Sequence, residues 1–224
     1  MKDDQAVHND PKYWNYRACL REPIPEIFEA AQLLREAADH SLSGQNKLAE
    51  LAIKAADMPV LSEWVESLWG PGKESSAYHR IRTVPGLPAI IPKQDRAPRM
   101  HGKKVKQALI DRDGYFCRYC GIPVIRAKIR KLFQQKYPEA ARWGSKNTTQ
   151  HSGFQCLWLT YEHLWPHSRG GQNDLDNMII SCQACNCGKF EKTLDELGLF
   201  NPLNEDFTRK QDSVWNGLED FKQS

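Results

Sequence analysis

The amino-acid sequence predicts an α+β protein in which a small N-terminal helical bundle precedes a metal-stabilised domain of two short strands and a helix. Apolar side chains recur at helical spacing near the N-terminus, two Cys-x-x-Cys pairs follow, and a strand–loop–strand pattern lies between those pairs. The predicted divisions are 1–70, the bundle; 71–100, a proline-rich basic linker; 101–200, the metal-stabilised domain with a basic insert at 122–156; and 201–224, an acidic tail packed on that domain.

Length and composition exclude several classes of protein. The 224 residues suffice for one large or two small domains, and a hydrophobic content of 40% argues against a disordered chain. No apolar run approaches the ~20 residues that span a bilayer, and the charged start MKDDQAVHND has no secretory signal. We therefore expect a cytoplasmic protein that does not contact a membrane.

The charges are unevenly distributed along the chain. Residues 1–70 hold 7 Lys and Arg against 12 Asp and Glu, residues 93–150 hold 15 against 4, and residues 191–224 hold 4 against 8. A basic middle between acidic ends indicates a bound polyanion such as nucleic acid, although an ordinary solvated face is the alternative.

Three short amphipathic helices are expected between residues 24 and 69. None can bury its apolar face alone, so they should pack as a bundle, which is also a candidate docking surface for a protein partner. The expected apolar stripes are Ile27, Ala31, Leu34 and Ala38; Leu48, Leu51, Ala52 and Ala55; and Leu61, Trp64, Val65 and Leu68.

The two Cys-x-x-Cys pairs predict a zinc site. Cys117 and Cys120 form the first pair, Cys182 and Cys185 form the second, and four thiolates complete a tetrahedron with no open position. The zinc should therefore be structural, and its binding should stabilise the fold. A redox role would not need the second pair, and Cys187 is an alternative fourth ligand to Cys185.

Between the pairs, the chain reads YEHLWPHSRGG over residues 161–171 and DN at 176–177, and the second pair continues as CNCGK over 185–189. These motifs resemble the HNH endonuclease family in its four-cysteine branch, over about residues 102–200. The resemblance implies the ββα-metal fold. Residues 157–163 and 177–181 are strand-like, and one helix is expected from Gly188 to a stop at Gly198.

Chemistry and resemblance together suggest roles for four residues. A neutral histidine accepts a proton near pH 7, so His163 is the expected general base. The resemblance implies that Glu162 and Asn186 bind a catalytic Mg²⁺ or Mn²⁺ and that Asn177 holds the loop behind His163. Glu162 replaces the more usual Asp, and neighbouring side chains on a strand point to opposite sides. Either a local twist therefore brings Glu162 and His163 to one site, or Glu162 acts from a bulge or a strand end. Asn186 stands where His is commoner, which favours Mg²⁺ or Mn²⁺ over softer ions.

The expected partner is DNA, most simply duplex DNA. Lys189 is expected near a helix N-terminus, where it can meet a phosphate. The expected DNA-contacting residues are Lys189, Arg169, Lys103, Lys104, Arg99, Arg130 and Lys131.

Three functions fit the sequence. The first is an endonuclease that nicks or cuts both strands with weak sequence preference, and family analogy extends this to restriction and defence against foreign or phage DNA. The second is a zinc-stabilised nucleic-acid-binding module without catalysis. The third is a nuclease subunit of a larger complex, with the helical bundle docking the partner.

Overall fold

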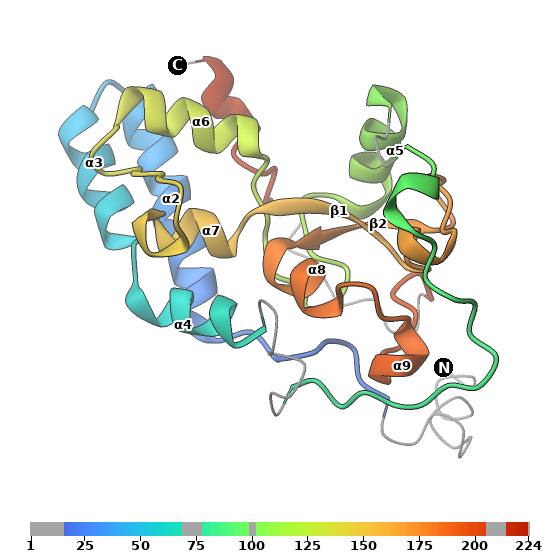
Figure 1. The fold of residues 1–224 in the computed structure, drawn as a ribbon. Helices are drawn as coiled ribbons and strands as arrows, with labels where there is room; N and C mark the ends of the chain where they lie inside the picture. The colour runs from blue at the N-terminus through green and yellow to red at the C-terminus, as the bar shows by residue number, and fades with distance from the viewer. Residues whose placement is uncertain (1–15, 69–77, 99–101, 205–213, 224) are drawn as a thin grey trace, which may run out of the picture.

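The computed structural model describes residues 16–68, 78–98, 102–204 and 214–223 (Figure 1). Within these ranges the protein is α+β, as the sequence predicted. The elements in chain order are α2 (Pro25–Leu42), α3 (Asn46–Ala55), α4 (Pro59–Leu68), η3 (Lys93–Asp95), α5 (Lys103–Asp113), α6 (Ala127–Lys136), η4 (Asn147–Thr149), α7 (Ser152–Cys156), β1 (Leu159–His163), η5 (His167–Arg169), β2 (Met178–Cys182), α8 (Gln183–Lys189), α9 (Leu194–Leu197) and η7 (Glu219–Gln223).

A two-stranded sheet followed directly by a helix forms the centre of the molecule. Strands β1 and β2 pair antiparallel, with Leu159 opposite Cys182 and His163 opposite Met178. Helix α8 begins at the residue after β2 and packs on both strands, while α5 packs on β2 (Figure 1). Every residue of β2 is buried, in keeping with its largely apolar sequence and the helices α5 and α8 that pack on it.

The expected single helix from Gly188 to Gly198 is wrong. The cysteine turn starts α8 earlier, with the Cys182 thiol accepting a hydrogen bond from the Cys185 amide at 3.4 Å. Helix α8 ends at Lys189, and the next residue, Phe190, has a φ of 50°, which is unusual for a bulky residue and costs on the order of 1–2 kcal/mol. A capping box between Thr193 and Glu196 then starts the separate helix α9. Local caps therefore override the apolar spacing.

Two of the three expected apolar stripes are buried. All members of the first, on α2, and of the third, on α4, lie in the core. The second stripe is wrong, because Leu48 and Leu51 are 46% and 62% exposed whereas Ala49 and Ile53 are buried. Helix α3 packs on α2, and the face that carries Ala49 and Ile53 is the buried one, so Leu48 and Leu51 are left exposed.

The insert 122–156 anchors the N-terminal helices to the rest of the molecule. The Tyr137 hydroxyl hydrogen-bonds to the Ser41 hydroxyl at 2.7 Å, and Arg142 pairs with Asp57 at 2.7 Å. Helix α4 also packs on α7 and α8, so the described core is continuous from α2 to the C-terminal turn. The division into domains stays a prediction.

The described part of the C-terminal segment packs against α6. The Phe221 ring stacks on Phe133 with ring centroids 3.8 Å apart, and the Trp215 indole donates to the backbone oxygen of Val124 at 3.2 Å. Glu219 pairs with Arg126. Residues 205–213 of the expected tail lie outside the described residues.

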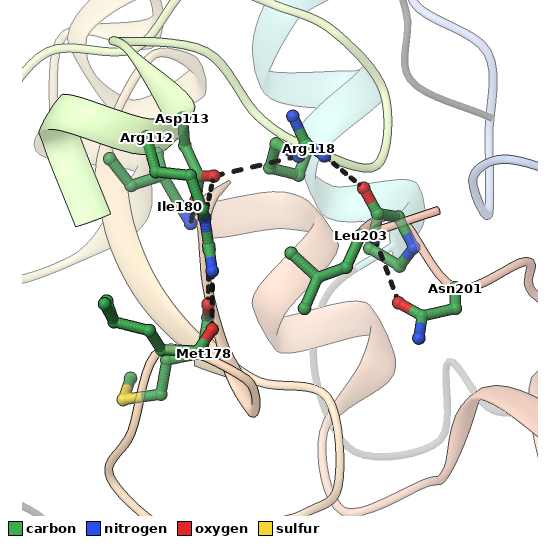
Figure 2. Close-up of polar contacts among 9 residues, drawn as sticks. Arg112, Asp113, Arg118, Met178, Ile180, Asn201 and Leu203 are labelled. Atoms are coloured by element: carbon green, nitrogen blue, oxygen red, sulfur yellow. Dashed lines mark hydrogen bonds and ion pairs between the residues drawn. The ribbon is translucent and has the colours of Figure 1, made fainter. Parts of the chain in front are cut away.

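A buried carboxylate fastens the sheet to its neighbours. Asp113, the last residue of α5, accepts a hydrogen bond from the Ile180 amide of β2 at 2.9 Å. Arg112 pairs with the same carboxylate, and Arg118 approaches it from the first cysteine turn, as Figure 2 shows. Arg118 also donates to the backbone oxygen of Pro202. The network joins four segments around β2 and keeps the buried charge paired.

The stability of the fold is expected to fall in mild acid because of His151. Its Nε2 donates to the Ile53 carbonyl at 2.8 Å and its Nδ1 accepts from the Phe154 amide at 3.3 Å, so the neutral ring is fully used. Burial lowers the pKa of His151, with Asp57 and Arg142 acting in opposite senses nearby. The unfolded chain, with a pKa of about 6.5, therefore takes up the proton first, and stability is lost as pH falls below that value.

The measurement is thermal unfolding between about pH 7.5 and about pH 5.5, across the ordinary histidine pKa. The melting temperature of the wild type should decrease on acidification, and His151→Gln should show a smaller decrease. His40→Ala, at the end of α2, is the matched control. Equal decreases in the wild type and His151→Gln would show that His151 is not the sensitive group.

Candidate functional site

The two Cys-x-x-Cys turns meet in space. The thiol sulfurs of Cys117, Cys120, Cys182 and Cys185 all lie within 4.8 Å of one another, and all four residues are buried. Cys187 is outside this cluster, and its sulfur accepts a hydrogen bond from the side-chain Nε2 of Gln183 at 3.1 Å. Cys185, and not Cys187, therefore completes the group of four thiols.

The cluster has the dimensions of a tetrahedral zinc site. The Cys120 and Cys182 sulfurs are 3.8 Å apart, and Zn–S bonds of about 2.3 Å give a tetrahedron edge of about 3.8 Å. Burial raises the pKa of the Cys120 thiol well above its ordinary value. Four soft ligands, buried together at this spacing, fit a structural metal ion.

A second group of polar side chains gathers at the end of β1. Glu162 and His163 are buried, and both line a cavity of about 660 Å³ together with Asn186 of α8. Because β1 ends at His163, two neighbouring side chains reach one cavity from either side of the strand. The structure thus brings together three residues that the sequence placed in one site. The cavity is lined by Lys93, Arg96, Ala97, Glu162, His163, Pro166, His167, Ser168, Gln183, Asn186, Cys187, Phe190 and Glu191.

Asn177 lies beside this cavity and holds the loop that follows His163. Its Oδ1 accepts from the Trp165 amide at 2.7 Å, and its Nδ2 donates to the carbonyls of Trp165 and Gln172 at 3.1 and 3.0 Å. Gly171 must lack a side chain here, because a Cβ would lie 2.0 Å from the Trp165 oxygen. The three hydrogen bonds give Asn177 the geometry of a loop clamp.

Asn173 contacts His163 directly, and the sequence analysis missed it. The Asn173 Nδ2 donates to the Pro98 carbonyl at 2.9 Å, which leaves its Oδ1 to accept from His163 Nε2 at 2.8 Å. This bond places the ring proton on Nε2 and leaves Nδ1 as the basic nitrogen. Asn173 lies in a polar loop without a distinguishing motif, so only the folded structure reveals the contact.

Lys189 lies inside the protein. It is 1% exposed, and its ammonium donates to Glu162 Oε1 at 3.0 Å and to the His163 carbonyl at 2.8 Å. Its expected place near a helix N-terminus is wrong, because it is the last residue of α8. The ion pair orients the Glu162 carboxylate and fastens the end of β1 to α8. The predicted contact between Lys189 and a phosphate stays a prediction.

Residues 78–98 form an extended strap across the site. The Ile91 amide donates to the Ser168 carbonyl at 2.7 Å, and His79 Nε2 lies 2.9 Å from the Gly188 carbonyl. Arg96 pairs with Glu191 at 3.1 Å. The strap brings two cations, those of Lys93 and Arg96, to the cavity wall. Its many prolines predicted the extended form, but no local pattern indicated its position.

The other expected DNA-contacting residues lie in different environments. Arg169 donates to the Pro88 carbonyl at 2.6 Å and pairs with Glu196, so it holds the strap. Arg130 is 7% exposed and lies over the Trp143 ring. It belongs to α6, which lies near the first residues of β1, whereas His163 is the last residue of that strand (Figure 1). The exposed members are Lys103, Lys104 and Lys131, and Arg99 lies outside the described residues.

Residues 153–191 match the family model described as HNH endonuclease. This segment contains β1, β2, the second cysteine pair and ten of the thirteen residues that line the cavity. The four-cysteine cluster is consistent with the zinc-binding branch of that family. No curated protein and no solved structure matches the chain. Among the described residues, no helix combines the length and apolar character required to cross a membrane.

Proposed function

We propose that the protein is a metal-dependent DNA endonuclease. One observation carries the proposal: a carboxylate, an imidazole and a carboxamide, from Glu162, His163 and Asn186, line one cavity within a segment that matches the HNH endonuclease model. Hydrolysis of a phosphodiester needs an activated water and a cation near the phosphate. These three side chains can activate the water and hold the cation.

The donor set fits a hard divalent ion. Glu162 and Asn186 supply oxygen ligands beside a cavity large enough to retain metal-bound waters, which suits Mg²⁺ or Mn²⁺. When bound, the ion supplies charge stabilisation at the phosphate. His163, held by Asn173 through Nε2, takes the proton from the attacking water at Nδ1. Lys189 keeps the Glu162 carboxylate directed toward α8.

DNA is the proposed substrate, bound through its phosphates with weak sequence preference. Support comes from the family match, from the excess of Lys and Arg over residues 93–150, and from Lys93 and Arg96 at the cavity. Such binding should weaken steeply with salt. A role in defence against foreign or phage DNA rests on family analogy alone.

A nuclease subunit of a larger complex is a further candidate, and its partner would dock on the N-terminal helices, where Leu48 and Leu51 of α3 are exposed. A non-catalytic DNA-binding module is the second candidate, since the cysteine cluster and the basic residues need no chemistry. The two candidates differ in whether DNA is cleaved when Mg²⁺ is added.

Supercoiled plasmid is expected to be nicked in Mg²⁺ or Mn²⁺ and to stay intact in chelator. Asn186→Ala removes one metal ligand at a partly exposed position, so the Mg²⁺ concentration for half-maximal nicking should rise by about 10-fold or more. Asn186→Asp retains an oxygen ligand and adds charge, so it should need no more Mg²⁺ than the wild type. Metal titrations of nicking rate provide the measurement.

Asn216→Ala, an exposed position in the C-terminal segment, is the matched control. Binding of plasmid without nicking in either metal would favour the non-catalytic module. An unchanged Mg²⁺ requirement in Asn186→Ala would remove Asn186 from the metal site.

A further inference from the structure

Phe190 is an aromatic residue whose side chain does not pack in the hydrophobic core. Its side chain is 64% exposed, yet it lines the same cavity as Glu162, His163 and Asn186. It follows the last residue of α8, and its amide donates to the Asn186 carbonyl at 2.9 Å. An exposed ring at this place contributes little to folding, so its position calls for another reason.

The backbone conformation of Phe190 is one that favours glycine. Its φ is 50° and its ψ is −123°, and the Lys192 amide donates to the Lys189 carbonyl at 3.0 Å across it. These values define the first central position of a type II′ turn, where glycine dominates. Among the described residues, Leu218 alone of the other non-glycine positions also has a positive φ. Phe190 therefore holds its ring at the cavity at a conformational cost.

The surroundings favour a nucleic-acid base as the occupant of this ring face. The cations of Lys93 and Arg96 line the same cavity and can accompany a phosphate backbone. Aromatic rings beside such cations bind unpaired bases by stacking, independently of base identity. In an intact duplex both faces of a base are covered by its neighbours, so stacking requires a base that is unpaired or displaced.

We propose that Phe190 stacks on an unpaired base next to the cleaved phosphodiester. This inference rests on the proposed nuclease function and narrows its substrate to DNA with a local interruption of pairing, such as a mismatch or a bubble. The ring, the strap cations and the catalytic group of Glu162, His163 and Asn186 then contact successive parts of one strand.

The test compares two labelled duplexes of equal length, one fully paired and one with a short central bubble, in Mg²⁺ at fixed salt. The wild type should cleave the bubble about 10-fold faster or more, because stacking of one base changes affinity by about that factor. Phe190→Gly should bring the ratio close to one, Phe190→Trp should keep it, and Phe190→Leu should lose most of it. Glycine suits the turn, so the melting temperature of Phe190→Gly should not fall.

Affinity measured in the His163→Ala background separates this inference from the proposed function. Tighter binding of the bubble that disappears with Phe190→Gly supports the stacking role even if no DNA is cleaved. Equal preference for the bubble in Phe190→Gly and the wild type would overturn it while leaving nuclease activity intact. Equal loss of cleavage on both duplexes would also overturn it, because the ring would then serve the position of α8 or a contact with another protein.

Discussion

His163→Ala is expected to lower the rate of Mg²⁺-dependent plasmid nicking by about 10²–10⁴-fold, the usual contribution of a general base. The imidazole lies at the end of β1 against the cavity, and Asn173 fixes its Nε2 as the hydrogen-bond donor. Alanine removes the Nδ1 that would accept the proton of water. DNA affinity should stay close to that of the wild type, because the phosphate contacts come from other side chains.

The measurement combines the single-turnover nicking rate with DNA affinity for the same preparation. His40→Ala, at the C-terminal end of α2, is a matched control and should nick at the wild-type rate. Asn173→Asp retains the acceptor for Nε2 and should keep most of the activity, whereas Asn173→Ala should lose part of it. Equal nicking by His163→Ala and the wild type would exclude the catalytic assignment.

Cys182→Ser is expected to remove the structural metal and most of the stability of the fold. Cys182 ends β2, caps α8 and belongs to the four-thiol cluster, so its loss opens the junction of strand and helix. Structural zinc contributes on the order of 10 kcal/mol in small zinc domains, which is comparable to the whole stability of an ordinary domain. We expect a fall of the melting temperature by more than ~10 °C and loss of bound zinc.

Cys187→Ser provides the control, because Cys187 lies in the same helix but outside the cluster. It should retain about one zinc per chain, in keeping with a single tetrahedral site. Zinc content by elemental analysis and thermal unfolding, with and without chelator, give the two readouts. Loss of zinc from Cys187→Ser and its retention by Cys182→Ser would reverse the ligand assignment.

Residue type, spacing and motif order were sufficient to predict that the four thiols would cluster and that Glu162, His163 and Asn186 would line one cavity. A Cys-x-x-Cys turn places two thiols on one side over a few residues, so Cys117 and Cys120 are informative without a fold. The helical stripes of α2 and α4 were equally readable, because an amphipathic helix buries a face that its own periodicity defines. The predicted stripe of α3 was wrong, since Ala49 and Ile53 are buried and the leucines are exposed.

Contacts between distant segments could not be read in this way. The Asn173 amide meets the Pro98 carbonyl from 75 residues away, and the Lys189 ammonium meets Glu162 from 27 residues away. Both contacts depend on where the backbone travels in space. The sequence spacing around an asparagine in a loop or a lysine in a helix does not predict which residue it contacts.

The sequence by itself predicted the α+β class and the cluster of four thiols from residue type and short-range spacing, and it predicted the group of Glu162, His163 and Asn186 from a motif order that resembles the HNH family. Only the folded chain decided that Lys189 faces inward, that the strap crosses the cavity, and that Phe190 adopts a glycine-like turn. These features depend on long-range packing, which sets the path of the backbone and can hold a residue against its own conformational preference.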